Sequence, residues 1–221
     1  MLRQIALAGF IALSCGAAQA GAIVSAASAT INSSGPGFGS IADTYNQNGL
    51  ATRYTSGVTD FATYIAGGPL HTAGFTGAEW FSEFNATSAS VTYDLGSLQS
   101  ISALALWNED AAGAGTLNLF QSADGINFTS LLSGLSPTDH GSVANYRADV
   151  FSFTAVTTRF VRLDMSGCAQ GASTFNACAL GEVAFRAGAD AVNVPEPTSI
   201  ALLGAGLAAI AGLRRRRARP Q

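Results

Sequence analysis

Short apolar segments with a period of two, separated by turn residues, run through the middle of this 221-residue chain. In the first, Val91, Tyr93 and Leu95 alternate with polar residues before Gly96. Six more segments follow, at 101–107, 117–121, 128–132, 150–153, 160–165 and 180–185. This alternation is typical of half-buried strands. Many short strands without a sustained amphipathic helix predict an all-β fold, a sandwich or jelly roll.

The first twenty residues have the features of a secretory signal peptide. Arg3 supplies a positive charge, residues 5–13 form an apolar stretch, and Ala18-Gln19-Ala20 fits a cleavage site between small residues. Cleavage there would leave Gly21 as the first residue. Cys15 allows a lipoprotein alternative, although the three residues before it match a lipobox poorly. We therefore expect the chain to be exported.

The C-terminal segment 191–221 combines a proline-flanked triplet, an uncharged apolar run at 198–213 and an arginine cluster at 214–219. Proline at both ends of the triplet keeps it out of a helix interior. The apolar run predicts a single membrane helix that is shorter than the ~20 residues of a comfortable span. By the positive-inside rule the arginines would stay in the cytoplasm and everything before Val194 would lie outside.

This tail resembles the PEP-CTERM sorting signal of Gram-negative bacteria. The matching residues are Val194, Pro195, Glu196 and Pro197, the apolar run, and Arg214, Arg215, Arg216 and Arg217. The resemblance implies transient anchoring in the inner membrane, cleavage near the triplet by an exosortase-type enzyme, and a mature protein that is periplasmic, at the cell surface or extracellular. An ordinary C-terminal membrane anchor is the alternative.

The exported part, residues 21–190, is the predicted folded domain. From Gly21 to Val194 the chain has five arginines against thirteen acidic residues, a net charge of −8, and lysine is absent from the whole chain. A surface without a basic patch disfavours nucleic acid as a partner. The low charged fraction and the many small residues are typical of a secreted β-protein.

Four stretches of this domain are similar to discoidin domains, also called coagulation-factor type C domains. They are 91–96 (VTYDLG), 101–107 (ISALALW), 122–128 (SADGINF) and 158–163 (TRFVRL), in the family's order. The resemblance covers residues 25 to 186 and implies a β-jelly roll. It also leaves a structural calcium ion as an open alternative, but residues 48–54 (NGLATRY) depart from the family's pattern where its calcium ligands occur. No other cofactor and no metal site are predicted.

Cys168 and Cys178 are the only cysteines of the exported domain. In an oxidising compartment such a pair forms a disulfide by default, and closing this short loop stabilises the fold by roughly 3 kcal/mol on the chain-entropy model. A zinc site would need more ligands than these two residues supply. We therefore predict a Cys168–Cys178 disulfide.

Motifs of known catalytic sites are missing from the sequence. The two histidines, His71 and His140, belong to no metal or triad motif and are expected to be structural or solvated. Glu79 and Glu83 flank an aromatic stretch, and Glu109-Asp110 follows Trp107. Paired carboxylates beside tryptophan can cleave glycosides, and they also occur where strand ends meet solvent. No catalytic residue is predicted.

The aromatic residues are the candidate ligand contacts. Tyr54, Tyr64 and Trp80 could stack on sugar rings, since aromatic faces pack against pyranose rings while polar tips bind hydroxyl groups. Core packing is the alternative and is favoured for Trp107. The sequence thus predicts a non-catalytic domain that binds an extracellular polysaccharide or envelope glycan. A structural or adhesive matrix protein is the first alternative, and a glycan-modifying enzyme is the second.

Overall fold

The computed structural model describes residues 21–74, 76–141, 144–171 and 175–188. The chain divides into two compact units, of which the first ends at Ala189. The predicted signal peptide, membrane helix and sorting residues (194–197 and 214–217) lie outside the described residues. None of the helices within the described ranges is long and apolar enough to span a bilayer.

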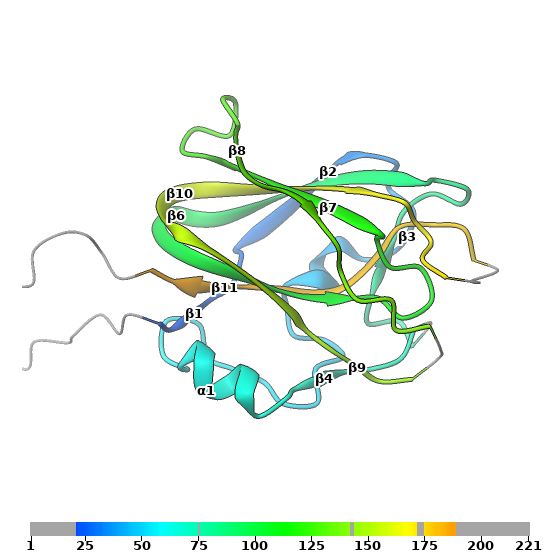
Figure 1. Cartoon of the computed structure of the whole chain (residues 1–221), viewed down its shortest axis with the longest axis horizontal. Coiled ribbons are helices and arrows are strands. Elements are labelled where there is room, and N and C mark those ends of the chain that lie inside the picture. The colour runs from blue at the N-terminus through cyan, green and yellow to red at the C-terminus, as the bar shows by residue number, and fades with distance from the viewer. Residues whose placement is uncertain (1–20, 75, 142–143, 172–174, 189–221) are drawn as a thin grey trace, which may run out of the picture. The chain divides into compact units, whose positions relative to one another are not determined.

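Strands dominate the described residues, in agreement with the predicted all-β class (Figure 1). The helices of the described ranges are a 3₁₀ turn, η1 (Ile41–Thr44), and the α-helix α1 (Phe61–Ala66). The strands are β1 (Ile23–Val24), β2 (Ser28–Ser33), β3 (Phe38–Gly39), β4 (Leu70–His71), β5 (Trp80–Phe81), β6 (Ser88–Asn108), β7 (Thr116–Ser122), β8 (Thr129–Leu135), β9 (Tyr146–Arg147), β10 (Asp149–Ser166) and β11 (Ala179–Ala187).

Two long antiparallel strands, β6 and β10, run through both layers of the sandwich. Their pairing shifts register between Ser152 and Val156 and again between Thr158 and Phe160. On β6 the change of layer falls at Gly96, whose φ of 82° is a conformation that glycine adopts without strain. The two segments predicted as separate strands at 91–96 and 101–107 are therefore one bent strand.

The first layer has the strand order β2-β6-β10-β7-β8, with Val91 of β6 opposite Ile31 of β2 and Leu163 of β10. In the second layer β6 lies between β10 and β11. Strand β11 pairs along its length first with β5 and then with β1, and β3 pairs with β5 at the edge. All pairings are antiparallel, so the predicted β-sandwich is confirmed.

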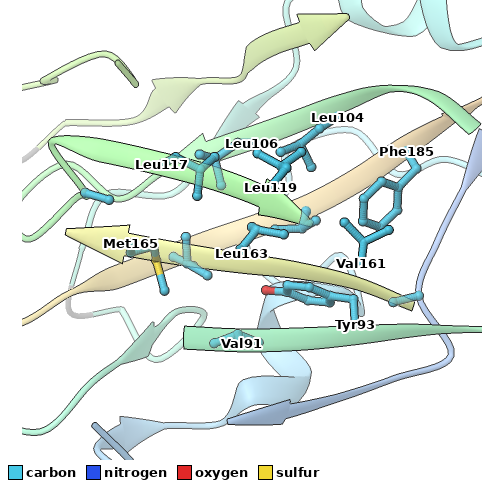
Figure 2. Packing of buried hydrophobic residues seen from close by; sticks show 14 of the residues in the cluster. Val91, Tyr93, Leu104, Leu106, Leu117, Leu119, Val161, Leu163, Met165 and Phe185 are labelled. Atoms are coloured by element: carbon cyan, nitrogen blue, oxygen red, sulfur yellow. The ribbon is translucent and has the colours of Figure 1, made fainter. Parts of the chain in front are cut away.

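The main core lies between the two layers (Figure 2). The first layer contributes the alternating residues that the sequence pattern singled out, and the second layer faces them from β6 and β11. Figure 2 shows these side chains converging: Val91, Tyr93, Leu117, Leu119, Val161, Leu163 and Met165 from one layer, Leu104, Leu106 and Phe185 from the other. At roughly 25 cal/mol for each Å² of apolar surface buried, this core is the main source of stability.

A second apolar cluster covers the outer face of the second layer. Strand β6 has small side chains there, Ala103 and Ala105. They leave room for Phe61 and Tyr64 of α1 and for Tyr54, which precedes this helix. Helix α1 starts at Asp60, whose carboxylate accepts a hydrogen bond from the Thr63 N–H at 2.8 Å. The second layer is thus buried on both faces, with α1, β4 and β9 beneath it (Figure 1).

The two ends of the described domain lie together. The N–H of Gly21 donates to the Ala187 carbonyl at 3.2 Å, and the N–H of Ala187 donates to the Ala22 carbonyl at 2.7 Å. Strand β3 and the beginning of β11 lie at the opposite end, which we call the distal end (Figure 1). The core is complete within residues 21–188, so this unit has what it needs to fold without the tail.

Candidate functional site

The three aromatic residues predicted to contact a ligand are all buried. Trp80 has no exposed surface, and Tyr54 and Tyr64 are 6% and 8% exposed. Trp80 belongs to the main core and donates from Nε1 to the Pro36 carbonyl at 2.8 Å. A ring without an exposed face cannot stack on a sugar, so the prediction of these three residues as ligand contacts is wrong for this structure.

The two tyrosines pack against each other instead. Their rings make an edge-to-face contact with centroids 5.4 Å apart. The Tyr54 hydroxyl donates to Glu182 Oε1 at 3.2 Å, and the Tyr64 hydroxyl donates to the Thr52 carbonyl. They close the second apolar cluster and satisfy polar groups inside it. The predicted core position of Trp107 is confirmed, since this residue has no exposed surface.

Exposed aromatic rings gather at the distal end. Phe38 on β3 is 55% exposed, and Phe84, which follows β5, is 53% exposed. Between them lies Phe175, whose ring centroid is 6.1 Å from that of Phe38 and 5.5 Å from that of Phe84. Phe81 of β5 contacts the same ring edge-to-face at 5.3 Å. Phe38, Phe84 and Phe175, from three separate segments, therefore form one aromatic surface, which the buried ring of Phe81 supports.

A cavity of about 260 Å³ opens beside these rings. We call it the aromatic pocket, and its lining residues are Phe38, Gly39, Gly77, Glu79, Phe81 and Phe175. Glu79 supplies the only charge of this lining. Its Oε1 accepts from the hydroxyls of Thr72 and Thr76 at 3.3 and 3.2 Å, and its Oε2 accepts from the Ala78 N–H at 3.2 Å. Burial raises the pKa of Glu79, and these hydrogen bonds oppose the rise.

Glycine allows the chain to enter this pocket. A Cβ at Gly37 would lie 1.9 Å from the Phe81 carbonyl oxygen, and a Cβ at Gly39 would lie 2.1 Å from that of Glu79. Both residues have φ near 73°, which other residues rarely adopt. The glycine-rich stretch 35–39 therefore exists to bring Phe38 against β5, and the Trp80 hydrogen bond to Pro36 fixes the same loop.

The disulfide holds the loop that carries Phe175. Cys168 and Cys178 are bonded to each other with their Cα atoms 5.0 Å apart, so the predicted disulfide is confirmed. The Cys178 N–H donates to Ser82 Oγ at 2.8 Å, and the Ser82 N–H donates to the Cys178 carbonyl at 2.8 Å. These contacts tie the loop to the chain between β5 and Phe84.

Of the four carboxylates that suggested glycoside cleavage, three lie inside the protein. Glu109 and Asp110 are almost fully buried, and Glu83 is exposed on the surface. Asp110 accepts from the N–H groups of Gly74 and Ala144 at 2.7 and 3.0 Å. Glu109 Oε2 accepts from the N–H groups of Ala111 and Ala112. The acids therefore hold loops together, whereas glycoside cleavage needs two carboxyl groups that flank a bound sugar.

Both histidines pack against Tyr146. The His71 ring is completely buried, with Nδ1 3.1 Å from the Thr72 carbonyl oxygen and Nε2 3.1 Å from that of Asn48. Burial is the main cause that lowers its pKa. The His140 ring centroid lies 5.3 Å from that of Tyr146 on β9. This arrangement agrees with the structural role expected for His71.

Stability should fall at alkaline pH because two buried acids keep their protons. Burial raises the pKa of Glu109 to about 9 and that of Glu182 to about 8, from an ordinary 4.5. The unfolded chain releases these protons near pH 4.5, so their stabilisation is complete below that pH and is lost as pH rises through 8 and 9. We expect the melting temperature to fall by several degrees between pH 6 and pH 9.5, at about 2–4 °C per kcal/mol.

Glu109→Gln provides the control for this prediction, because an amide keeps the donor of the protonated acid and cannot ionise. Its melting temperature, measured by calorimetry, should depend less on pH than that of the wild type. If the melting temperatures of the two proteins depended on pH in the same way, Glu109 would not be protonated in the folded protein at neutral pH.

The calcium ion that the discoidin resemblance leaves open would need six to eight oxygen ligands. Two carboxylates near residues 46–54 accept hydrogen bonds from the protein itself. Glu182 Oε2 accepts from the Gln47 N–H at 2.9 Å, and Asp43 Oδ1 accepts from the amide groups of Asn46 and Asn48 at 3.1 and 3.2 Å. Nowhere in the described ranges do three His, Cys, Asp or Glu side chains group so as to hold a metal.

Residues 193–217 match the family model of the PEP-CTERM protein-sorting motif. The chain carries this sorting signal. The match covers the triplet, the apolar run and Arg214 to Arg217 of the arginine cluster, and it confirms that resemblance. A PEP-CTERM motif is a signal for export and for a surface or extracellular location. No curated protein sequence matches the chain.

Several solved structures are similar to this chain at low identity. One is chitosan-binding module 1 of a chitosanase/glucanase from Paenibacillus sp. IK-5, with 19% identity and a TM-score of 0.45 over 76% of this chain and 98% of the module. A pectin-binding carbohydrate-binding module has 18% identity and a TM-score of 0.45, over 76% and 94%. A Clostridium perfringens module in complex with GalNAc-β-1,3-galactose has 17% identity and a TM-score of 0.45, over 73% and 94%.

Sequence reasoning missed the residues of the aromatic pocket. It weighed tyrosine and tryptophan as ligand contacts, but it did not weigh phenylalanine, which lacks a polar tip. The available signal was the pattern of the loops: Phe38 lies between Gly37 and Gly39, and Phe175 lies between the two disulfide cysteines. A large apolar residue in a constrained surface loop is a candidate for binding.

Proposed function

We propose that the protein is an exported, exosortase-processed module that binds a carbohydrate of the extracellular matrix or envelope at the aromatic pocket, without chemical turnover. The observation that carries this proposal is the cavity at the distal end that three phenylalanines line, of which Phe38 is 55% exposed. Aromatic rings bind the apolar face of a pyranose. A volume of about 260 Å³ suits a single sugar residue better than a long chain.

Rigidity supports binding at this site. The edge-to-face contacts of Phe175, the disulfide and the fixed glycine loop hold the rings in place before a ligand arrives. A preformed site loses less conformational entropy on binding than a mobile one. The sorting motif supports a glycan as the partner, because it directs the domain to the surface, where polysaccharides are found.

The glycan array is the first test, with alanine variants to locate the site. Phe38→Ala removes a ring that lines the pocket, and Phe84→Ala removes an exposed ring that packs against the lining residue Phe175. Each should weaken binding of a glycan found on the array by about 1–3 kcal/mol, or about 5- to 150-fold in Kd. Leu98→Ala is the matched control, because Leu98 is 57% exposed and lies outside the aromatic pocket. Unchanged affinity in both phenylalanine variants, measured by calorimetry, would refute binding at this pocket.

Two other functions give different results in the same experiments. A structural or adhesive matrix protein would show no saturable glycan binding, although it would still be sorted and processed. A glycan-modifying enzyme would release products from a polysaccharide. Because Glu109 is buried, its replacement should leave such an activity in place.

A further inference from the structure

A further cavity lies on a different face from the aromatic pocket and shares no residue with it. It follows the outer face of the first layer, over β2, β6 and β10 and beside the β7–β8 hairpin, with a volume of about 700 Å³. A second depression of about 490 Å³ continues from it around residues 31–36 and shares Asn32 and Ser33. We call the two together the sheet groove. From Ser28 to Asn32 it follows about 13 Å of strand at 3.3 Å per residue.

A ladder of polar side chains crosses the floor of the sheet groove from strand to strand. Asn32 Nδ2 on β2 donates to Ser90 Oγ at 3.1 Å and to Thr92 Oγ1 at 2.9 Å, both on β6. Ser90 Oγ in turn donates to Asp164 Oδ1 on β10 at 2.6 Å. These mutual hydrogen bonds fix donors and acceptors in an array that extends across three strands.

Aromatic rings and an arginine form the wall of the groove toward β7. The Arg162 guanidinium carbon lies 4.4 Å from the ring centroid of Phe120 and 4.8 Å from that of Phe128. Its Nε forms an ion pair with Asp164 Oδ1 at 3.1 Å, but the geometry is not that of a hydrogen bond. A guanidinium held between two rings keeps its planar donors in one orientation.

The β7–β8 hairpin holds this wall in position. Asp124 Oδ1 accepts from the N–H groups of Ile126 and Asn127 at 2.9 and 2.8 Å. These hydrogen bonds lower the pKa of Asp124, so the carboxylate stays ionised and the turn stays closed at neutral pH. Gly125 lies against the Phe160 ring, where a Cβ would meet ring carbons at 3.2 Å. The loop therefore presents Phe128 from a fixed turn.

The charges of the groove cancel in pairs. Arg159 makes two hydrogen bonds to Asp94, both of 2.8 Å, and Arg162 pairs with Asp164. A polyanion would find no unbalanced positive charge here, and the domain as a whole is acidic. Strand backbones within the layer are paired with one another, so a peptide lying on this face would lack the backbone hydrogen bonds of strand addition. A hydroxyl-rich, uncharged ligand fits what remains.

We propose that the sheet groove is a second carbohydrate-binding site, which takes a segment of an uncharged polysaccharide chain. This inference rests on the proposed function, because it assumes that the protein binds carbohydrate. Hydroxyl groups of the ligand would exchange hydrogen bonds with Asn32, Ser90 and Asp164, and its apolar faces would lie against Phe128. With the aromatic pocket at the distal end, one molecule then contacts two polysaccharide segments at once, which raises the avidity for a network.

Affinity gel electrophoresis of the folded domain, residues 21–188, tests this inference. The probes are three neutral polysaccharides, galactomannan, xyloglucan and dextran, and the anionic polysaccharide alginate. We expect at least one neutral polymer to retard the wild type more than alginate does. Asn32→Ala combined with Phe128→Ala should weaken that retardation about 10-fold in apparent Kd and leave a residual effect from the aromatic pocket. Ile126→Ala is the matched control, since it is on the same hairpin, is 81% exposed and does not line the groove.

The outcomes separate the two sites. Partial loss in the groove variant, partial loss in Phe84→Ala and complete loss in the combined variant would support two sites. Wild-type retardation of the groove variant, with melting temperatures confirming that it is folded, would overturn the groove and leave the aromatic pocket standing. Absence of retardation by all three neutral polymers, or stronger retardation by alginate, would also overturn the groove proposal, while the glycan array decides the aromatic pocket independently.

Discussion

Replacement of Trp80 by alanine is expected to destabilise the domain by about 3–5 kcal/mol, the range measured for large aromatic residues in protein cores. The indole has no exposed surface and belongs to the core between the two layers. Its removal would leave a cavity beneath β5 that the neighbouring strands cannot close, because β5 is paired on both sides, with β3 and β11. The variant would also lose the hydrogen bond to the Pro36 carbonyl.

Urea denaturation of residues 21–188 measures this effect, and Phe84→Ala is the comparison. Phe84 is half exposed, so its replacement should change the free energy of unfolding by less than about 1 kcal/mol while it weakens glycan binding. Trp80→Ala should instead lower the stability of the domain, and weaker glycan binding should follow from that. The reason is that the glycine-rich loop that carries Phe38 is hydrogen-bonded to Trp80. If the Trp80→Ala protein had wild-type stability but did not bind glycan, Trp80 would be a ligand contact after all.

The strands could be predicted because their apolar residues face one core. Val91, Tyr93 and Leu95 alternate with residues that face the sheet groove, so the period-two pattern was clear. The segment 101–107 lacks a polar face because the second layer is buried on both sides, and a continuous apolar run is the signature of such a strand. The sequence analysis counted this run among the half-buried strands, so the cover over its outer face was not predicted. The sequence did not identify which residues form that cover.

Tyr54 and Tyr64 are in that cover, which explains why the prediction for them failed. Their segment has no regular period because it consists of turns, one six-residue helix and a two-residue strand. Each tyrosine buries its ring against β6 and directs its hydroxyl to an internal acceptor, and from sequence this is indistinguishable from an exposed tyrosine in a polar loop. The aromatic pocket was equally hidden, since Phe38, Phe84 and Phe175 meet only through the long-range pairing of β3, β5 and β11.

Replacement of Pro195, Glu196 and Pro197 by alanines is expected to abolish processing, so that the full-length chain accumulates in the inner membrane. The triplet precedes an apolar run that is too short to span comfortably, and the arginines after it favour the cytoplasmic side. Two prolines keep the triplet extended, the backbone state in which proteases bind their substrates. Alanines would instead extend the helical run toward the domain and remove the recognised residues.

Intact mass spectrometry of the secreted and membrane fractions measures this outcome. The wild-type protein should lack the residues after about Val194 to Pro197, whereas the alanine variant should keep Ala218–Gln221 and remain with the membrane. Replacement of Arg214 to Arg217 by serine separates recognition from topology, because it leaves the triplet intact and weakens only the cytoplasmic retention. Secreted, membrane-free wild-type protein that still carries Ala218–Gln221 would show that the motif is not processed. The tail would then act as a plain anchor, and the domain would have to reach its glycan from the membrane surface.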